Sequence, residues 1–198
     1  VWGFRPDLYK HMRALEKYNR ADDYTQMEMF SNAINKLLNS GYKFIGLDHM
    51  AKENDVLSIA TKEKTIDRNA LSHSSGKARD ILAIGPNSMS SFGKGYYQNY
   101  HSLPKYYSQI DAGNLPLIRG FEANDDDLLR RDVIFTLICH SQVEFKKIEK
   151  EHNIDSFKNY FETELNNELK IMQSEGLIII DAEEIVVTKL GRLFMRHI

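Results

Sequence analysis

Two adjacent polar residues, Asp48 and His49, follow an apolar run and carry side chains that could move protons or bind a polar ligand. The run at residues 42–47 is typical of a short strand. Open α/β sheets and barrels place functional groups where buried strands end. The pair is therefore a candidate for a barrel mouth. The alternative is a pair of loop residues that bond only locally, since the other six histidines show no metal-ligand spacing.

A second candidate is the glycine-rich segment at residues 85–95, which is small, polar and follows the apolar run at 80–85. That run predicts a strand buried on both faces, as in a parallel sheet. The glycines would let the backbone approach a ligand closely. The spacing is neither a P-loop nor a dinucleotide fingerprint. No nucleophile-elbow motif occurs anywhere, so a hydrolase has little support.

Composition excludes several classes of protein. The only cysteine, Cys139, cannot build a disulfide framework or a multi-thiolate metal site within one chain, which favours a reducing, cytoplasmic location and predicts no bound metal. A net charge of -2 gives no basic footprint for nucleic acid. No apolar stretch approaches the roughly 20 residues that span a bilayer, so we expect no membrane segment. The start, Val1-Trp2-Gly3, lacks an initiator methionine and indicates a shortened or excised chain.

The first part of the chain alternates helix and strand signals. Thr25 and Glu28 have capping-box spacing, and apolar residues recur at helical intervals until Gly41. Shorter helices are expected near residues 55–64 and 102–113. With the strands expected at 42–47 and 80–85, these helices predict α/β units up to about residue 120.

The second part reads as mostly helical. Asn124 and the three aspartates after it predict a capped helix start, which we favour over a cation site. A short helix near residues 145–148, a long helix over 157–172 and a hairpin over 177–187 follow, with Thr188 capping a last helix. Helix, helix and hairpin is a winged-helix-like order.

Five stretches match, in order, the motifs of one enzyme family. Residues 41–52 closely resemble the Gly-Tyr-x-x-Ile-Gly-(Met/Leu)-Asp-His-Phe-Ala stretch of the oxygen-independent coproporphyrinogen III oxidases. The other matches are Arg68-Asn69, residues 85–99, residues 118–120 and residues 130–134, with further similarity over 186–196. By this resemblance the chain is identified as a member of that family along nearly its whole length.

The resemblance implies a fold and a reaction. Such enzymes have a partial (β/α) radical S-adenosylmethionine barrel and then a small helical, winged-helix-like domain, which here would be residues 1–118 and 119–198. They oxidatively decarboxylate coproporphyrinogen III, a tetrapyrrole, to protoporphyrinogen IX in haem biosynthesis. A four-iron four-sulfur (4Fe-4S) cluster cleaves S-adenosylmethionine to start this radical chemistry. One cysteine cannot supply the three thiolates of the family's Cys-x-x-x-Cys-x-x-Cys motif. We therefore expect the distal part of a longer oxidoreductase, or an inactive relative, with no cofactor bound to this chain.

The resemblance also places individual residues. Gly3 and Met89 fall where the family contacts S-adenosylmethionine, although Met89 could instead be packing that plugs the barrel mouth. Arg68 and Asn69 precede the substrate loop and, with Asp48 and His49, are candidates for the barrel mouth. The family's loop continues Phe-Gln-Gly-Tyr-Thr-Thr, whereas residues 70–75 read Ala-Leu-Ser-His-Ser-Ser. This departure leaves open a divergent paralogue that acts on another tetrapyrrole.

A different class of function also stays open. The C-terminal part could be a binding module for a protein or nucleic acid, although the expected helix over 157–172 is not basic. Strands at Phe44 and Ile81 would lack the barrel strands that normally pair with them, so self-association of the isolated chain is expected.

Overall fold

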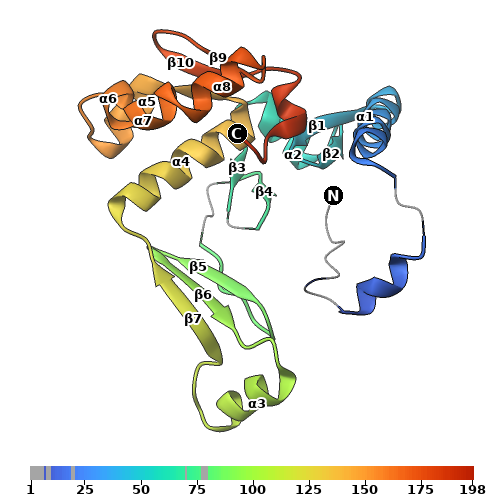
Figure 1. Cartoon of the computed structure of the whole chain (residues 1–198). Helices are drawn as coiled ribbons and strands as arrows, with labels where there is room; N and C mark the ends of the chain where they lie inside the picture. The colour runs from blue at the N-terminus through green and yellow to red at the C-terminus, as the bar shows by residue number, and fades with distance from the viewer. Residues whose placement is uncertain (1–6, 8–9, 19–20, 70, 77–79) are drawn as a thin grey trace.

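The computed structural model describes residue 7 and residues 10–18, 21–69, 71–76 and 80–198. Helices and short antiparallel sheets follow one another along the chain (Figure 1). The elements are η1 (Lys10–Leu15), α1 (Asp23–Asn39), β1 (Tyr42–Gly46), β2 (His49–Lys52), α2 (Val56–Lys62), β3 (Asp67–Arg68), β4 (His73–Ser74), β5 (Met89–Phe92), β6 (Gly95–Asn99), α3 (Leu103–Asp111), β7 (Leu117–Glu122), α4 (Asp125–His140), β8 (Gln142–Glu144), α5 (Phe145–His152), α6 (Phe157–Tyr160), α7 (Glu162–Asn166), α8 (Glu168–Ser174), β9 (Ile178–Ile180), β10 (Glu184–Val187) and η2 (Gly191–Phe194).

The first helix forms as predicted, but with a different cap. The side chain of Asp22, not Thr25, caps α1, because its carboxylate accepts a hydrogen bond of 2.7 Å from the Thr25 backbone N–H. Gly41 follows the helix with φ of +81°, a conformation that glycine adopts without steric cost. The chain then turns directly into β1.

The strands of the first part pair differently from the prediction. β1 forms an antiparallel hairpin with β2 instead of joining a parallel sheet, and Leu47 and Asp48 make its tight turn. In the described part of the chain every strand pair is antiparallel. The expected α/β repeat is therefore not seen in the described residues. Even β6 and β7, which are connected through α3, pair antiparallel, whereas a crossover helix in an α/β repeat joins parallel strands.

The strand expected at residues 80–85 is wrong. Ile81 makes only an isolated antiparallel bridge to Ser91, while Leu82 is 78% exposed and Ile84 is 93% exposed. A short apolar run fits a buried strand and an exposed segment equally well when only the sequence is read. The ordered strands lie just after it, in the glycine-rich segment itself.

Strands β5, β6 and β7 form a three-stranded antiparallel sheet with β6 in the centre. This sheet and α3 project away from the other elements as an arm (Figure 1). The buried side chain of Asn99 donates to the Gly85 carbonyl (2.9 Å) and to the Ser88 hydroxyl (3.0 Å), and so fixes the loop before β5. The domain boundary expected after residue 118 falls within β7, and that division stays a prediction.

The second part begins with the predicted capping box. The Asn124 side chain accepts from the Asp127 N–H (2.8 Å), and the Asp127 carboxylate accepts from the Asn124 N–H (2.9 Å). The long helix expected over residues 157–172 is instead three short helices, α6, α7 and α8, which break at Phe161 and Asn167. The predicted hairpin is β9–β10, and β10 also pairs with β8.

Two hydrophobic clusters hold these elements. The larger one fills the space between α4, the short helices and the β8–β10–β9 sheet, where Phe145 and Phe157 stack with ring centroids 4.5 Å apart. Leu47, from the turn between β1 and β2, packs into this cluster. Cys139 of α4 belongs to the smaller cluster, with Ile45 and Ile66. α4 therefore joins the β1–β2 hairpin to the C-terminal helices.

Candidate functional site

Four sequence segments bring polar side chains together beside α4. We call Asp48, His49, Arg68, His73 and Arg196 the polar cluster. The Asp48 carboxylate lies 3.1 Å from Nδ1 of His49 and 3.3 Å from a guanidinium nitrogen of Arg196. The His49 and His73 rings meet edge to face, with centroids 5.0 Å apart. Three predicted residues, Asp48, His49 and Arg68, thus lie together with His73 of β4 and Arg196 of the C-terminal segment.

Arg68 is half-buried in β3, which packs against α4. Its guanidinium carbon lies 5.8 Å from the centre of the Phe135 ring. Burial lowers the pKa of Arg68, and the positive charge of Arg196 also lowers it, while Asp48 opposes the change. A guanidinium keeps its charge in proteins. Arg68 and Arg196 therefore give the cluster two cations against one carboxylate.

His73 is the most buried member of the cluster, with 6% of its surface exposed. Burial, together with the nearby His49 and Arg68 and against the smaller effect of Asp48, lowers its pKa to about 4. His73 is thus neutral near pH 7, with one ring nitrogen that donates and one that accepts. A neutral imidazole near the guanidinium group of Arg68 can accept a hydrogen bond or bind a polar ligand.

Several polar atoms in this cluster are buried without a hydrogen-bond partner among the described residues. They are both ring nitrogens of His73, a terminal guanidinium nitrogen of Arg68, and Nδ1 of His49, which lies at ion-pair distance from Asp48 without hydrogen-bond geometry. Buried polar groups are nearly always paired. Their concentration in one place indicates a site that a ligand or another part of a longer protein completes.

Asn69, the fourth candidate, shapes the loop and does not join the contacts of the cluster. Its side-chain oxygen accepts hydrogen bonds of 2.9 Å from the backbone N–H groups of Leu71 and Ser72. Asparagine commonly closes turns in this way. The turn carries the chain back so that His73 pairs with Arg68 across the β3–β4 hairpin.

Met89 lies in a different sheet. It starts β5, pairs with Gln98 of β6, and is 43% exposed. Gln98 accepts a hydrogen bond of 2.7 Å from Arg119 of β7, which pairs with it in the register. The expectation of a loop after a buried strand is therefore corrected to an antiparallel hairpin, with Met89 on the arm. Its sheet, β5–β6–β7, is separate from the β1–β2 and β3–β4 hairpins that carry most of the polar cluster. Gly3 lies outside the described residues.

Sequence reasoning missed His73 and gave Arg196 no role beyond a matching position. The only signal for His73 was its place in the loop that departs from the family motif, because a lone histidine has no diagnostic spacing. Arg196 is 148 residues from Asp48 in the sequence, so only the fold could bring the two together.

Comparison with known proteins first identifies the domain family of the C-terminal part. Residues 123–194 match the HemN C-terminal domain family. These residues contain α4, the short helices and the β8–β10–β9 sheet.

The whole chain is also similar to larger proteins. It is 33% identical over 193 residues to the oxygen-independent coproporphyrinogen III oxidase of Salmonella typhimurium, which covers 98% of this chain and 42% of that relative. The Pseudomonas aeruginosa protein of the same name is 34% identical with the same coverage. A solved structure of coproporphyrinogen III oxidase (HemN) from Escherichia coli, described as a radical SAM enzyme, superposes with a TM-score of 0.89 at 32% identity, over 99% of this chain and 45% of that one. The chain is homologous to the C-terminal region of oxygen-independent coproporphyrinogen III oxidases, and spans under half the length of these relatives.

The residues present do not fit an iron-sulfur cluster. Such clusters are held by several thiolates, and Cys139 is the single cysteine of the sequence and is buried. Within residues 7, 10–18, 21–69, 71–76 and 80–198, no group of three or more His, Cys, Asp or Glu side chains could hold a metal ion. In the same residues, no helix has both the length and the apolar content needed to cross a membrane.

Proposed function

We propose that this chain is the C-terminal part of a longer radical S-adenosylmethionine enzyme that oxidatively decarboxylates coproporphyrinogen III to protoporphyrinogen IX. The observation that carries the proposal is the match along 99% of the chain to a solved coproporphyrinogen III oxidase, with a TM-score of 0.89. The cluster and its thiolates would come from the rest of the longer protein, and the chain by itself would be inactive and bind neither cofactor.

The polar cluster would contact the substrate. Coproporphyrinogen III carries propionate groups, and Arg68 and Arg196 are cations suited to carboxylates. Asp48 orients Arg196 and His49, because its carboxylate lies within 3.3 Å of both. Buried donors without partners favour a ligand that brings acceptors, which a carboxylate does.

The arm would contact the cofactor. Met89 presents a thioether at the exposed edge of β5 and could pack against the adenine of S-adenosylmethionine, with Gly3 as the second contact. In this proposal, residues 1–118 complete the partial barrel. Residues 119–198 form the winged-helix-like domain, which is supported by the order of α4, α5 and the β9–β10 hairpin.

The test compares two proteins under anaerobic conditions. The longer protein, with an upstream Cys-x-x-x-Cys-x-x-Cys motif, is reconstituted with iron and sulfide, reduced, and given S-adenosylmethionine and coproporphyrinogen III. Formation of protoporphyrinogen and of 5′-deoxyadenosine is followed by chromatography. Both products are expected from the longer protein and neither from the 198-residue chain. Cleavage of S-adenosylmethionine with no decarboxylation of this substrate would contradict the proposed substrate.

One observation favours a second candidate function. His73 stands where the family's substrate loop has its tyrosine, and its buried ring nitrogens favour a polar contact different from that of a tyrosine hydroxyl. The longer protein could therefore use a different tetrapyrrole. The same assay with other tetrapyrroles separates the two candidates by which compound is consumed.

A further inference from the structure

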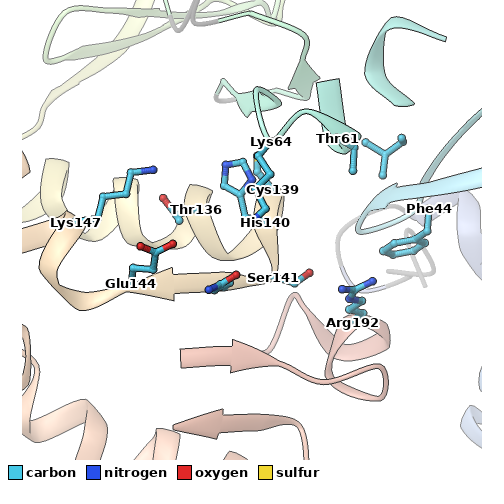
Figure 2. Close-up of a pocket in the computed structure, with 12 residues that line it drawn as sticks. Phe44, Thr61, Lys64, Thr136, Cys139, His140, Ser141, Glu144, Lys147 and Arg192 are labelled. Carbon is cyan, nitrogen blue, oxygen red and sulfur yellow. The ribbon is translucent and has the colours of Figure 1, made fainter. Parts of the chain in front are cut away.

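A cavity of about 200 Å³ lies on the side of β1 that packs against α4, apart from the polar cluster. Its walls come from five places in the fold: β1, the end of α2, the corner between α4 and β8, the start of α5, and η2. Figure 2 shows the side chains that line it. The cavity and the polar cluster share no residue.

Basic side chains dominate the lining of this cavity. Lys64 and Lys147 lie near His140, Arg192 lines the cavity from the side of Phe44, and Glu144 supplies the one carboxylate in the lining (Figure 2). Among the described residues, neither the two lysines nor Arg192 forms an ion pair. Like charges gathered around a cavity repel one another, and a bound anion relieves that repulsion.

The other polar groups of the cavity add few donors. The hydroxyls of Thr61 and Thr136 already donate to the carbonyls of Leu57 (2.8 Å) and Asp132 (2.7 Å) in their own helices. Recognition would therefore depend on the cationic groups. These groups favour an oxyanion, because ammonium and guanidinium groups donate strong hydrogen bonds to phosphate and carboxylate oxygens.

Lys64 stands at a backbone position that usually carries glycine. The end of α2 is a Schellman motif, in which Thr65 N–H donates to Ala60 (2.9 Å) and Lys64 N–H donates to Thr61 (3.3 Å). Lys64 has φ of 56°, and a left-handed conformation is unfavourable for a residue with a Cβ. Backbone geometry therefore does not account for a lysine at this position.

Helix dipoles account for only part of the charge. Lys64 and His140 lie at the ends of α2 and α4, where positive charge is favourable. Lys147 lies in the first turn of α5, where positive charge is unfavourable. Arg192 approaches from η2, after β10. Arg192 counts as a basic residue in the last turn of that short helix, so Lys147 is the cation that no helix terminus explains.

We propose that this cavity binds a small oxyanion, a phosphate or carboxylate group, through Lys64, Lys147 and Arg192. The cavity is smaller than the roughly 300–1,000 Å³ of sites that enclose a drug-sized molecule, so it would take a single anionic group. The inference is argued from the cavity residues and does not rest on the tetrapyrrole reaction proposed above.

The test is calorimetric titration of the 198-residue chain with inorganic phosphate and, in a separate experiment, with acetate, both at constant low ionic strength. We expect saturable binding of one anion per chain. The anion that binds more tightly shows whether the cavity prefers phosphate or carboxylate. Lys147→Gln should weaken it about tenfold, because a charged hydrogen bond is lost. Lys146→Gln is the matched control, since Lys146 is the adjacent residue of α5, carries the same charge and does not line the cavity. If both variants weaken anion binding equally, the effect is due to net charge alone and the proposed site is wrong.

Lys64→Gly separates binding from folding. Glycine suits the left-handed position, so the melting temperature should not fall, while anion binding should weaken about tenfold. As a second readout, bound anion should raise the pKa of His140 in an NMR titration. That pKa is lowered by burial and then by the charges of Lys147 and Lys64, against Asp67. The proposal is overturned if neither anion binds saturably and the pKa of His140 does not change when the anions are added.

Discussion

At the scale of single residues, His73 is the least exposed of the buried polar side chains in the described part of the chain. It is 6% exposed, it lies beside Gly46, His49 and Arg68, and its pKa is lowered to about 4. Burial disfavours its charged form, and the nearby guanidinium adds to that effect. The native state therefore holds a neutral imidazole down to a pH at which an exposed histidine is already charged.

This lowered pKa predicts a dependence of stability on pH. An unfolded chain binds a proton at His73 near pH 6.5, whereas the native chain binds it only near 4. Between these values the unfolded state holds more protons, so the free energy of unfolding should fall as the pH drops from about 6.5 to about 4. His73→Gln should reduce this slope in urea unfolding measured across that range. The lowered pKa of His140 acts in the same direction and leaves part of the slope.

The control for this prediction is His101→Gln, at an exposed position outside the cluster. The explanation fails if His73→Gln and His101→Gln have the same slope, or if the NMR signal of His73 titrates close to pH 6.5.

Met89 provides the second prediction at this scale, on the longer protein. Met89→Asp should weaken S-adenosylmethionine binding by about 1–3 kcal/mol, because it puts an unpaired charge into an apolar contact. The melting temperature should change little, since the side chain is 43% exposed. Phe92→Asp is the control, because Phe92 is three residues along β5, on the opposite face, and is 56% exposed. Unchanged binding with a lower melting temperature would make Met89 a packing residue.

At the scale of elements, Gly46 sets how closely β1 approaches its neighbours. A Cβ there would lie 2.7 Å from Nε2 of His73 and 2.9 Å from the carbonyl oxygen of Ile138 in α4. Neither the buried ring nor the helix backbone can move away easily. The position of His73 in the polar cluster therefore requires glycine at residue 46.

Gly46→Ala should lower the free energy of unfolding by about 1–3 kcal/mol, as overpacking of a filled site does. Urea unfolding with circular dichroism measures this change. Gly76→Ala is the matched control, because nothing lies within 4 Å of a Cβ built at that position. If both variants unfold at the same urea concentration, β1 has room to shift and the packing argument is wrong.

The elements that could be predicted from the sequence are those whose ends are encoded locally. The termini of α4 and α1 follow from Asn124 and Gly41, because caps act within a few residues. The apolar run at Ile81 was misassigned because hydrophobicity alone cannot tell a buried strand from an exposed segment. Breaks at Phe161 and Asn167 lack proline or glycine and depend on tertiary packing. Part of the polar cluster could be predicted for the same reason. Asp48 and His49 are adjacent in the sequence, whereas His73 and Arg196 are distant from them and are brought close only by folding.

At the scale of the whole molecule, large apolar side chains remain exposed on the arm. Phe121 is 57% exposed, Leu115 is 77% exposed, and every residue of β7 is exposed. The β1–β2 sheet has two strands, and Ile81 makes a single bridge. Exposed edges and apolar patches of this kind favour association.

We therefore expect the 198-residue chain to form dimers or larger species as its concentration rises, measured by light scattering. Phe121→Lys should shift this equilibrium toward the monomer, because a charge is added to the exposed strand β7. Lys105→Ala on α3 is a control that leaves the sheet unchanged. A monodisperse monomer with slow amide exchange at Phe44 and Ile81 would contradict the expectation.

The pairing of β8 with β10 also constrains the order of events on the ribosome. Gln142 and Glu144 cannot form their strand pairing until Val186 and Glu184 have been synthesised, about 40 residues later. Until then the aromatic side chains of α5 and α6 lack the sheet that covers them. Chaperones that bind exposed apolar segments would therefore meet this part of the nascent chain, whereas the β5–β6 hairpin, whose partners are close in sequence, can form as it emerges.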